Sequence, residues 1–210
     1  MIKHNINNFP DIDFQKWKSF GDNYVGDYII DNTNKFAIEN SIKWLYGEPF
    51  DCNIAGKTET KKGNPNKGLY IAGPCGTGKT LFAKILRDYA KSSGVTLIIE
   101  GKTVKTNWIP VHATEITDQF QNGEDIGIYK RQPILHIEDL GTEPISSNYM
   151  GNKTEVLKNI IERRGDFDCV TIITSNYSPE SSTLFTKYGE RVQSRLKGLN
   201  YFSINGSDRR

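Results

Sequence analysis

Hydrophobic residues along the chain follow two alternating spacings, and this alternation predicts the order of the secondary structure. Short apolar runs, which are typical of buried strands, occur at Leu69–Ala72, Val95–Ile99, Ile134–Ile137, Val170–Thr174 and Tyr201–Ile204, with a further extended stretch at Trp108–Val111. Apolar residues at helical spacing fall between these runs, over residues 81–89, 114–121, 154–164 and 179–197, the last with a break near Gly189. Strands that alternate with helices predict an α/β fold with a largely parallel sheet.

The residues before the first apolar run have a different character. Over residues 1–50, aromatic and aliphatic positions predict a helical N-terminal extension, in which Asn34 caps a helix and Gly47 ends it. We expect its aromatic side chains to pack against the main domain, and a partner-binding face is the alternative. Residues 51–68 are polar, basic and rich in Gly, Asn and Lys, which is typical of a linker or loop. The main domain is expected over residues 69–210.

Composition and charge narrow the class of protein. The chain has 210 residues and a formal charge of +2, which suits one domain with a core and neither demands nor excludes nucleic acid. No apolar run approaches the length of a membrane span, and the first residues lack the apolar core of a secretory signal. Cys52, Cys75 and Cys169 are odd in number and far apart, which argues against a disulfide framework. We therefore expect a cytoplasmic protein without a membrane partner.

A phosphate-binding loop follows the first apolar run. The pattern G-x-x-x-x-G-K-[ST] is matched in full by Gly73, Pro74, Cys75, Gly76, Thr77, Gly78, Lys79 and Thr80. Glycines let backbone N–H groups turn toward a phosphate chain, and a helix that starts near Gly78 directs its positive end at the same anion. We expect Lys79 to reach the outer phosphates and the Thr80 hydroxyl to bind Mg²⁺. The sequence therefore predicts a site for ATP with Mg²⁺.

Two acids and an amide stand at the ends of later strands. Glu138 and Asp139 directly follow the run 134–137, and Asn176 follows the strand that begins at Val170. In such folds, ligands bind at the carboxyl ends of the parallel strands. We expect both acids to lie at the metal site and to act in catalysis. One would orient the water shell of Mg²⁺, and the other would polarise the attacking water. Asn176 is expected to hydrogen-bond the γ-phosphate and that water.

An arginine pair lies near the end of the chain. Arg191 and Arg195 are four residues apart and share one helical face. An exposed basic face is the ordinary interpretation of such a pair. The sharper hypothesis is an arginine finger that enters the site of a neighbouring subunit beside the γ-phosphate. That hypothesis requires head-to-tail self-association.

Taken in order, these motifs resemble the AAA+ ATPases, specifically the DnaC/DnaI helicase-loader and IstB group. The resemblance covers about residues 66–210 and rests on the phosphate loop and on residues 135–143, 172–176, 189–196 and 205–209. It implies a P-loop domain whose five-stranded parallel sheet has the order 5-1-4-3-2 and is flanked by helices. It assigns Lys79 and Thr80 to the Walker A element and Glu138 and Asp139 to Walker B. It further assigns Asn176 to sensor 1, Arg195 to the arginine finger and Arg209 to sensor 2.

The resemblance also implies a function, namely an ATPase that delivers a replicative DNA helicase to single-stranded DNA during replication. We expect weak, sequence-tolerant DNA binding through residues 114–130, with Lys130 and Arg131 as the cations. The group normally has Asp as the first Walker B acid, so the order Glu138-Asp139 leaves slow hydrolysis open. The alternatives are an IstB-like transposition regulator and a nucleotide-gated binding module with little hydrolysis. A GTPase ranks last, because no Asn-Lys-x-Asp element follows.

Two further departures concern other parts of the chain. The N-terminal region has no cysteine cluster, so the zinc-binding helicase-contact domain of some loaders is absent. Residues 97–107 are longer than the usual link before the second strand and have no assigned role.

Overall fold

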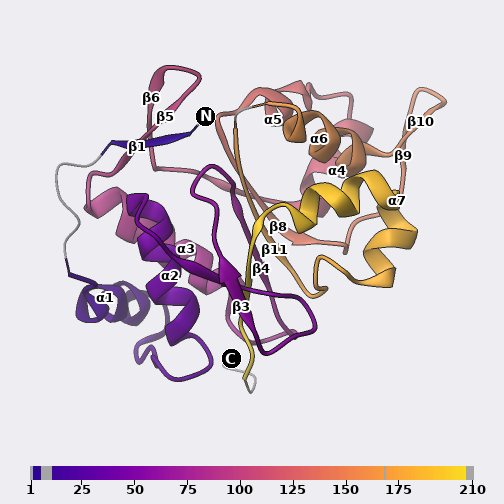
Figure 1. The fold of residues 1–210 in the computed structure, drawn as a ribbon. Helices are drawn as coiled ribbons and strands as arrows, with labels where there is room; N and C mark the ends of the chain where they lie inside the picture. The colour runs from indigo at the N-terminus through magenta and orange to yellow at the C-terminus, as the bar shows by residue number, and fades with distance from the viewer. Residues whose placement is uncertain (1, 6–10, 168, 207–210) are drawn as a thin grey trace.

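The computed structural model describes residues 2–5, 11–167 and 169–206. At its centre lies a parallel sheet of five strands in the order β12-β4-β11-β8-β7 (Figure 1). These strands are β4 Leu69–Ala72, β7 Pro110–His112, β8 Ile134–Leu140, β11 Val170–Ser175 and β12 Asn200–Ser203. Numbered in chain order within this sheet, they stand in the expected order 5-1-4-3-2. Among the described residues, seven more strands form three small antiparallel sheets that were not expected.

The run Val95–Ile99 does form a strand, but outside the central sheet. This strand, β5 Thr96–Ile99, pairs antiparallel with β1 Lys3–Asn5 and with β6 Lys102–Lys105. Its side chains alternate, with Leu97 and Ile99 buried, and this pattern suits a sheet that is covered on one face only. The long link over residues 97–107 is therefore a hairpin, and β7 is the second strand of the central sheet.

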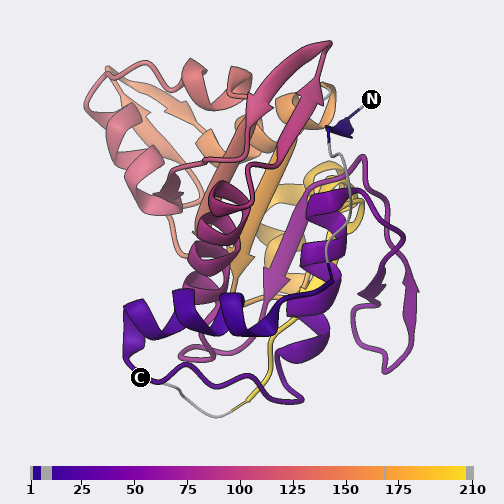
Figure 2. The ribbon, with the colours of Figure 1, turned by 90° about the vertical axis from the view of Figure 1, so that its left-hand side faces the viewer.

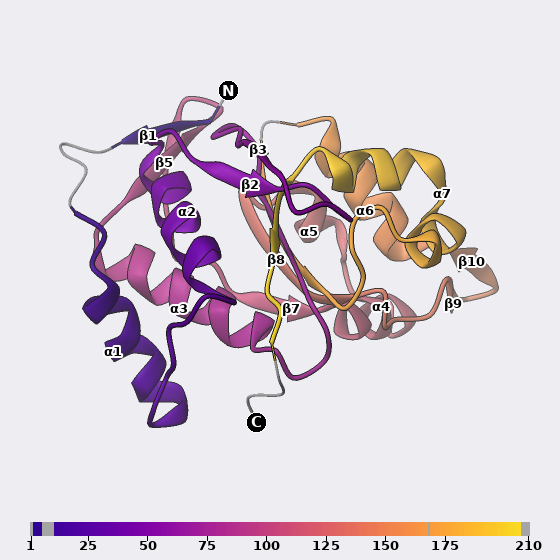
Figure 3. The same cartoon turned by 60° about the horizontal axis from the view of Figure 1, so that its bottom comes forward.

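Helices cover both faces of the central sheet (Figure 3). Helices α1 Phe14–Val25, α2 Lys35–Tyr46 and α3 Lys79–Ser92 lie on one face, and α4 Ala113–Gln121, α6 Val156–Gly165 and α7 Ser182–Lys197 lie on the other. Each face of the sheet therefore has its own hydrophobic core, the first core under α1, α2 and α3 and the second under α4, α6 and α7. Alternate residues of β4 belong to the two cores, Leu69 and Ile71 to the first and Tyr70 and Ala72 to the second. The short helix α5 Gly127–Arg131 and the hairpin β9 Ser147–Tyr149 with β10 Asn152–Thr154 lie on the second side (Figure 1).

The N-terminal helices belong to the first core. Asn34 and Gly47 occupy the N-cap and C-cap of α2, as predicted. Trp17 of α1 is fully buried, with its ring centroid 5.1 Å from that of Phe82 and 6.0 Å from that of Tyr89, both on α3. The aromatic residues of the extension therefore pack against the chain itself, which is what we expected rather than the alternative of a partner-binding face.

The segment expected to be a linker is folded. Within residues 51–68, β2 Asp51–Asn53 and β3 Thr60–Lys62 form an antiparallel hairpin, the purple pair of strands at the outer edge in Figure 2. The Asn53 Oδ1 accepts a hydrogen bond of 2.9 Å from the backbone N–H of Ser203. The side-chain amide of Asn200 donates to three carbonyl oxygens of residues 64–68. The segment therefore lies along the edge strand β12. The side-chain amide of Asn53 satisfies a backbone N–H of β12, and that of Asn200 satisfies backbone carbonyls of the segment.

The conformation of α7 bears out the predicted break. Gly189 has φ 81° and ψ 173°, which lie outside the helical region, so the helix consists of two pieces. Among the residues described, no helix has both the length and the apolar character needed to cross a membrane.

Replacing Trp17 by alanine tests whether the extension is part of the core. We expect Trp17→Ala to lower the free energy of unfolding by about 3–5 kcal/mol, because a fully buried indole is lost. The matched control is Phe185→Ala, since Phe185 is 49% exposed, with an expected cost under about 1 kcal/mol. Urea unfolding followed by circular dichroism measures both values. Equal stabilities for the two variants would contradict the assignment of α1 to the core.

Candidate nucleotide-binding site

A cavity of about 710 Å³ lies where the N-terminal extension meets the segments that follow the central strands. It is bounded by the loop between β4 and α3, by the end of β8 and by the end of β11. Its lining residues are Tyr24, Val25, Asp27, Tyr28, Ile29, Asp31, Thr33, Cys75, Gly76, Thr77, Gly78, Lys79, Thr80, Leu81, Lys84, Asp139, Asn176 and Gly206. The volume falls in the range of small-molecule sites. The structure thus brings the phosphate-loop pattern, one of the two acids and the amide into one cavity.

Glycine is required at several positions of the loop for different reasons. Gly76 and Gly78 have φ values of 81° and 88°, a region that other residues rarely adopt. A Cβ on Gly73 would lie 1.9 Å from the carbonyl oxygen of Ile204, so only glycine fits beside β12. Gly78 is the N-cap of α3 and has no side chain that could cap the first N–H groups of that helix, whose first residues, Lys79 to Leu81, line the cavity. The positive end of the helix dipole therefore points to the predicted phosphate position.

Lys79 is held against its own loop. The residue is only 5% exposed, and its Nζ donates a hydrogen bond of 2.8 Å to the carbonyl oxygen of Pro74. The Thr77 hydroxyl donates to the same oxygen over 2.9 Å. The carbonyl of Pro74 therefore fixes the two ends of the loop relative to each other. Gly73 and Pro74 themselves do not line the cavity.

Asp139 is the one of the two predicted acids that lines the cavity, and it has an unusual backbone. Its φ of 52° lies in the left-handed region, which costs free energy for a residue other than glycine. Its backbone N–H donates to the Thr174 Oγ1 over 3.1 Å. Pairing between β8 and β11 shifts register here, because Ile137 faces Ile173 whereas Leu140 faces Ser175. This bulge turns the Asp139 carboxylate toward the cavity and not along the strand.

His112 contacts the same carboxylate and was missed by the sequence analysis. Its Nε2 lies 3.2 Å from Asp139 Oδ2, and its Nδ1 lies 2.7 Å from the hydroxyl of Thr114. The backbone N–H of Thr114 also donates to Nδ1, because His112 is the N-cap of α4. Nδ1 is therefore an acceptor, which places the proton of the neutral ring on Nε2, where it faces Asp139. The signal available in the sequence was the position of His112 between a strand and a helix.

Glu138 is the other predicted acid. It does not line the cavity, and it interacts electrostatically with Lys84 and Arg87 of α3. Its Oε1 is buried and has no hydrogen-bond partner among the described residues. Burial raises the pKa of the Glu138 carboxyl, and the charge of Lys84 opposes that shift. Of the two predicted acids, Asp139 therefore lines the cavity and Glu138 does not, and the role expected for Glu138 stays a prediction.

Asn176 and Thr80 do line the cavity. Asn176 follows Ser175, whose hydroxyl donates a hydrogen bond of 2.7 Å to the carbonyl oxygen of Leu140. This bond ties the end of β11 to the end of β8 and sets the position of Asn176 relative to the acid. His136, expected in the core, is 1% exposed, and burial lowers its pKa to about 3.

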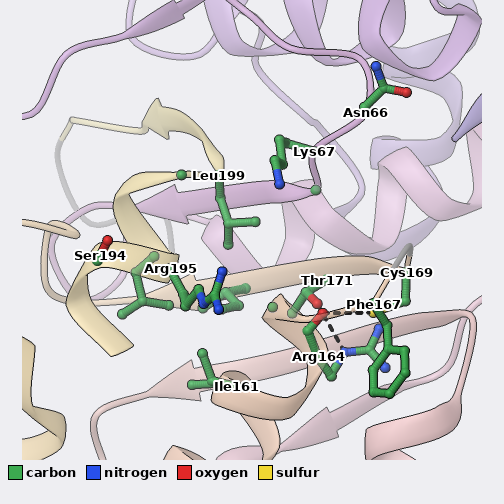
Figure 4. Close-up of a pocket in the computed structure, with 15 residues that line it drawn as sticks. Asn66, Lys67, Ile161, Arg164, Phe167, Cys169, Thr171, Ser194, Arg195 and Leu199 are labelled. Carbon is green, nitrogen blue, oxygen red and sulfur yellow. Dashed lines mark hydrogen bonds between the residues drawn. The ribbon is translucent and has the colours of Figure 1, made fainter. Parts of the chain in front are cut away.

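Arg195 lies in a different place. It lines a hollow of about 170 Å³ with Lys67, Arg164 and Phe167 (Figure 4), away from the residues of the larger cavity. Its Nη2 lies 2.5 Å from Asp166 Oδ1. A Cβ on Gly165 would be 2.6 Å from the Arg195 Cδ, so the glycine gives the arginine room. Within one chain the structure does not bring this arginine to the candidate site.

Two other arginines were considered in the sequence analysis, Arg191 and Arg209. The side chain of Arg191 is 64% exposed and lies 3.9 Å from Asp166. Arg209 falls outside the described residues.

The N-terminal extension supplies the other wall of the cavity, which no sequence pattern indicated. The residues between the end of α1 and the start of α2 face the phosphate loop, among them Val25, Tyr28 and Ile29. The hydroxyl of Tyr24 donates a hydrogen bond of 2.6 Å to Asp88 Oδ2 on α3, which fixes the end of α1 beside the loop.

Comparison with known proteins defines the fold. No family model matches the sequence, and no curated protein matches it. Solved structures do match. The crystal structure of the DnaC helicase loader superposes with a TM-score of 0.55 at 20% identity, over 91% of this chain and 99% of that one. A putative primosome component from Streptococcus pyogenes serotype M3 gives 0.56 at 20% identity, over 87% and 85%.

A third structure extends the likeness. AMPPCP-bound DnaA from Aquifex aeolicus gives a TM-score of 0.54 at 19% identity, over 86% of this chain and 48% of that one. The chain therefore has the AAA+ fold, as its motifs predicted.

The half-buried position of Glu138 predicts a pH-dependent cost to stability. A carboxyl whose pKa is raised in the folded state favours folding below its ordinary pKa of 4.5 and loses that contribution as pH rises through the raised value. We therefore expect Glu138→Gln to raise the Tm at pH 7, and we expect the gain to vanish below pH 4.5. Differential scanning calorimetry at both pH values measures this, with the exposed Glu180→Gln as the control. A gain that does not change with pH would contradict the burial argument.

Proposed function

We propose that the chain is an ATP-dependent helicase loader that binds ATP with Mg²⁺ in the cavity between β4, β8 and β11. One observation carries the proposal, namely that Lys79, Asp139 and Asn176 line the same cavity although they are far apart in sequence. These three are the residue types that phosphoryl transfer needs for the phosphates, the metal and the attacking water.

The phosphates would lie at the N-terminus of α3. Residues 76–80 line the cavity there, and the N–H groups of the first turn of α3 would supply donors to phosphate oxygens. Lys79 would exchange its hydrogen bond to the Pro74 carbonyl for a phosphate oxygen, and a charged acceptor makes the stronger bond.

Thr80 and Asp139 would hold Mg²⁺. Among the described residues, no group of three or more His, Cys, Asp and Glu side chains could hold a metal ion by itself. This arrangement fits Mg²⁺, which proteins bind through one or two carboxylates together with substrate phosphates and water. The Thr80 hydroxyl and the Asp139 carboxylate both line the cavity and are oxygen ligands of the required kind.

Hydrolysis would depend on Asp139 and Asn176. The Asp139 carboxylate can accept a hydrogen bond from the attacking water and orient it, and the Asn176 amide can donate to the γ-phosphate and accept from that water. The His112 Nε2–H occupies one oxygen of Asp139 at 3.2 Å and leaves the other for this task. The metal ion, when bound, supplies charge stabilisation at the phosphates.

The wall formed by the N-terminal extension would receive the base. Val25, Tyr28 and Ile29 supply apolar surface there, and such surface favours the stacking of a flat ring. The extension would thereby contribute to nucleotide affinity.

Support for the role in replication comes from the fold. The superposition with the DnaC helicase loader takes in nearly all of both chains, 91% of this one and 99% of that one. We infer that the chain assembles head to tail, that Arg195 leaves Asp166 to reach the nucleotide of the neighbouring subunit, and that the partner is a replicative helicase. Lys130 and Arg131, at the end of α5, are the proposed contacts to single-stranded DNA.

A second candidate is a nucleotide-gated binding module with slow hydrolysis. Two observations favour it: Glu138 does not line the cavity, and Asp139 is engaged by His112. The two candidates share the ATP site and differ in the rate of phosphate release.

Two substitutions separate binding from hydrolysis. We expect Lys79→Ala to weaken ATP binding at least about tenfold, because it removes the cation beside the phosphates. We expect Asp139→Asn to retain binding and to lower kcat by about 10²-fold or more, because the amide cannot take a proton from water. Fluorescent-nucleotide titration and phosphate release measure the two effects. The control is Lys91→Ala, at the exposed end of the same helix. Normal ATP binding by Lys79→Ala would refute the site.

Loading of a helicase tests the cellular role. We expect the purified chain, with ATP, to increase the amount of replicative helicase bound to circular single-stranded DNA, and we expect Lys79→Ala to lose this effect. The amount of helicase that co-elutes with the DNA in gel filtration is the measurement. If ATP-competent protein leaves helicase binding unchanged, the loader assignment is wrong while the nucleotide site stands.

A further inference from the structure

A buried polar cluster joins the turn after the two acids to helix α7. The side chain of Glu143 is fully inaccessible to solvent, and its Oε1 lies 3.2 Å from the Nζ of Lys187, whose side chain is 10% exposed. The hydroxyl of Tyr188, itself 3% exposed, donates to the same Glu143 oxygen. We call Glu143, Lys187 and Tyr188 the latch. None of the three lines the candidate cavity, and the proposed reaction uses none of them directly.

The latch binds both backbone groups of Gly141 in the turn of residues 139–143, which we call the acid turn. The N–H of Gly141 donates to Glu143 Oε2 over 2.9 Å, and the carbonyl oxygen of Gly141 accepts from the Nζ of Lys187 over 2.7 Å. Lys187 also donates to the carbonyl oxygen of Glu143. Both backbone groups of Gly141, two residues after Asp139, are therefore fixed by side chains.

The same turn is closed directly onto Asp139. The N–H of Thr142 and its hydroxyl both donate to the carbonyl oxygen of Asp139, over 3.2 Å and 2.8 Å. A displacement of Gly141 or Thr142 would therefore rotate the peptide group of Asp139. Asp139 has a left-handed φ of 52°, and such a conformation persists only where neighbouring contacts over-determine it.

Stability alone does not account for the latch. Burying an ion pair costs desolvation free energy that its attraction often fails to offset, and apolar replacements are often neutral or stabilising. What a satisfied buried network supplies is a single geometry. Burial and the neighbouring Glu143 carboxylate raise the pKa of Tyr188, so its hydroxyl stays a donor.

We propose that Glu143 and Lys187 are positioning residues for ATP hydrolysis, which hold the turn 139–143 on α7 so that the Asp139 carboxylate faces the γ-phosphate. The proposal rests on the proposed function of the cavity. It assigns no role in ATP binding to the latch, because the phosphate loop and α3 make no hydrogen bond or ion pair with it among the described residues.

Separate measurement of kcat and of ATP affinity tests the proposal. We expect Lys187→Met, which keeps the length of the chain without its charge, to lower kcat about tenfold or more, since small misplacements of catalytic groups have effects of this size. The Kd for a fluorescent ATP analogue should stay within about twofold of the wild-type value. Glu143→Gln should act in the same direction, and the double variant should lose no more than the more impaired single one. Lys197→Met, an exposed lysine on the same helix, is the matched control.

The outcomes distinguish this proposal from that of the site. If Asp139→Asn abolishes turnover while Lys187→Met and Glu143→Gln turn over as the wild type does, the site stands and the latch has no positioning role. If both latch variants lose ATP binding together with turnover, the latch is structural and the proposal is overturned. If wild-type protein binds no ATP, both proposals fall. Should Lys187→Met not fold, Glu143→Gln, which keeps shape and hydrogen-bonding atoms, decides the matter alone.

Discussion

Parallel pairing of β11 with β4 on one side and β8 on the other is the constraint on which the candidate site depends. Residues Ile172–Ser175 pair in register with Leu69–Ala72, and Val170–Ile173 pair with Ile134–Ile137. Three strand ends consequently meet at one edge of the sheet, and the residues that follow them are brought together although they lie up to a hundred positions apart. Only parallel strands place the segments that follow them at the same edge. The site is therefore a property of the sheet, and an error in strand order would disperse it.

Within that edge, the acid turn is the part held by the most independent contacts. His112 reaches Asp139 from β7, Thr174 of β11 accepts the N–H of Asp139, and Lys187 of α7 donates to the carbonyl oxygen of Gly141. Each contact comes from a different element, so the left-handed backbone of Asp139 is maintained by packing across the second core and not by local propensity. The half-buried Glu138 beside it has the opposite character, because its Oε1 has no hydrogen-bond partner among the described residues and burial raises the pKa of its carboxyl. Such local conflict is common where function and stability compete.

The sequence predicted those features that depend on local pattern. The position of the phosphate loop between a strand and a helix, and the break at Gly189, follow from motif spacing and hydrophobic periodicity, and the structure confirms both. The order of the central strands was implied by the family resemblance, and the structure has that order. The prediction of a strand at residues 95–99 was correct. The sheet to which this strand belongs depends on its pairing with Lys3–Asn5, which hydrophobic periodicity cannot reveal. The hairpin in residues 51–68 is stabilised by Asn53 and Asn200, and polar residues of this kind are also typical of loops. His112 and the latch were missed because their roles arise only from tertiary contact.

The N-terminal extension and the rest of the chain cannot be separated energetically. Trp17 of α1 is buried against α3, and the hydroxyl of Tyr24 donates to Asp88 on α3, so contacts with the main domain hold the end of α1 and the wall formed by residues 24–33. A ligand that contacts this wall binds only the state in which α1 is docked, and therefore stabilises that docking by mass action. Arg195 presents the opposite case, because it pairs with Asp166 on its own chain and lies outside the cavity. Within the described residues, the phosphate loop, Asp139 and the wall formed by residues 24–33 thus meet in one cavity, whereas Arg195 belongs to a separate hollow.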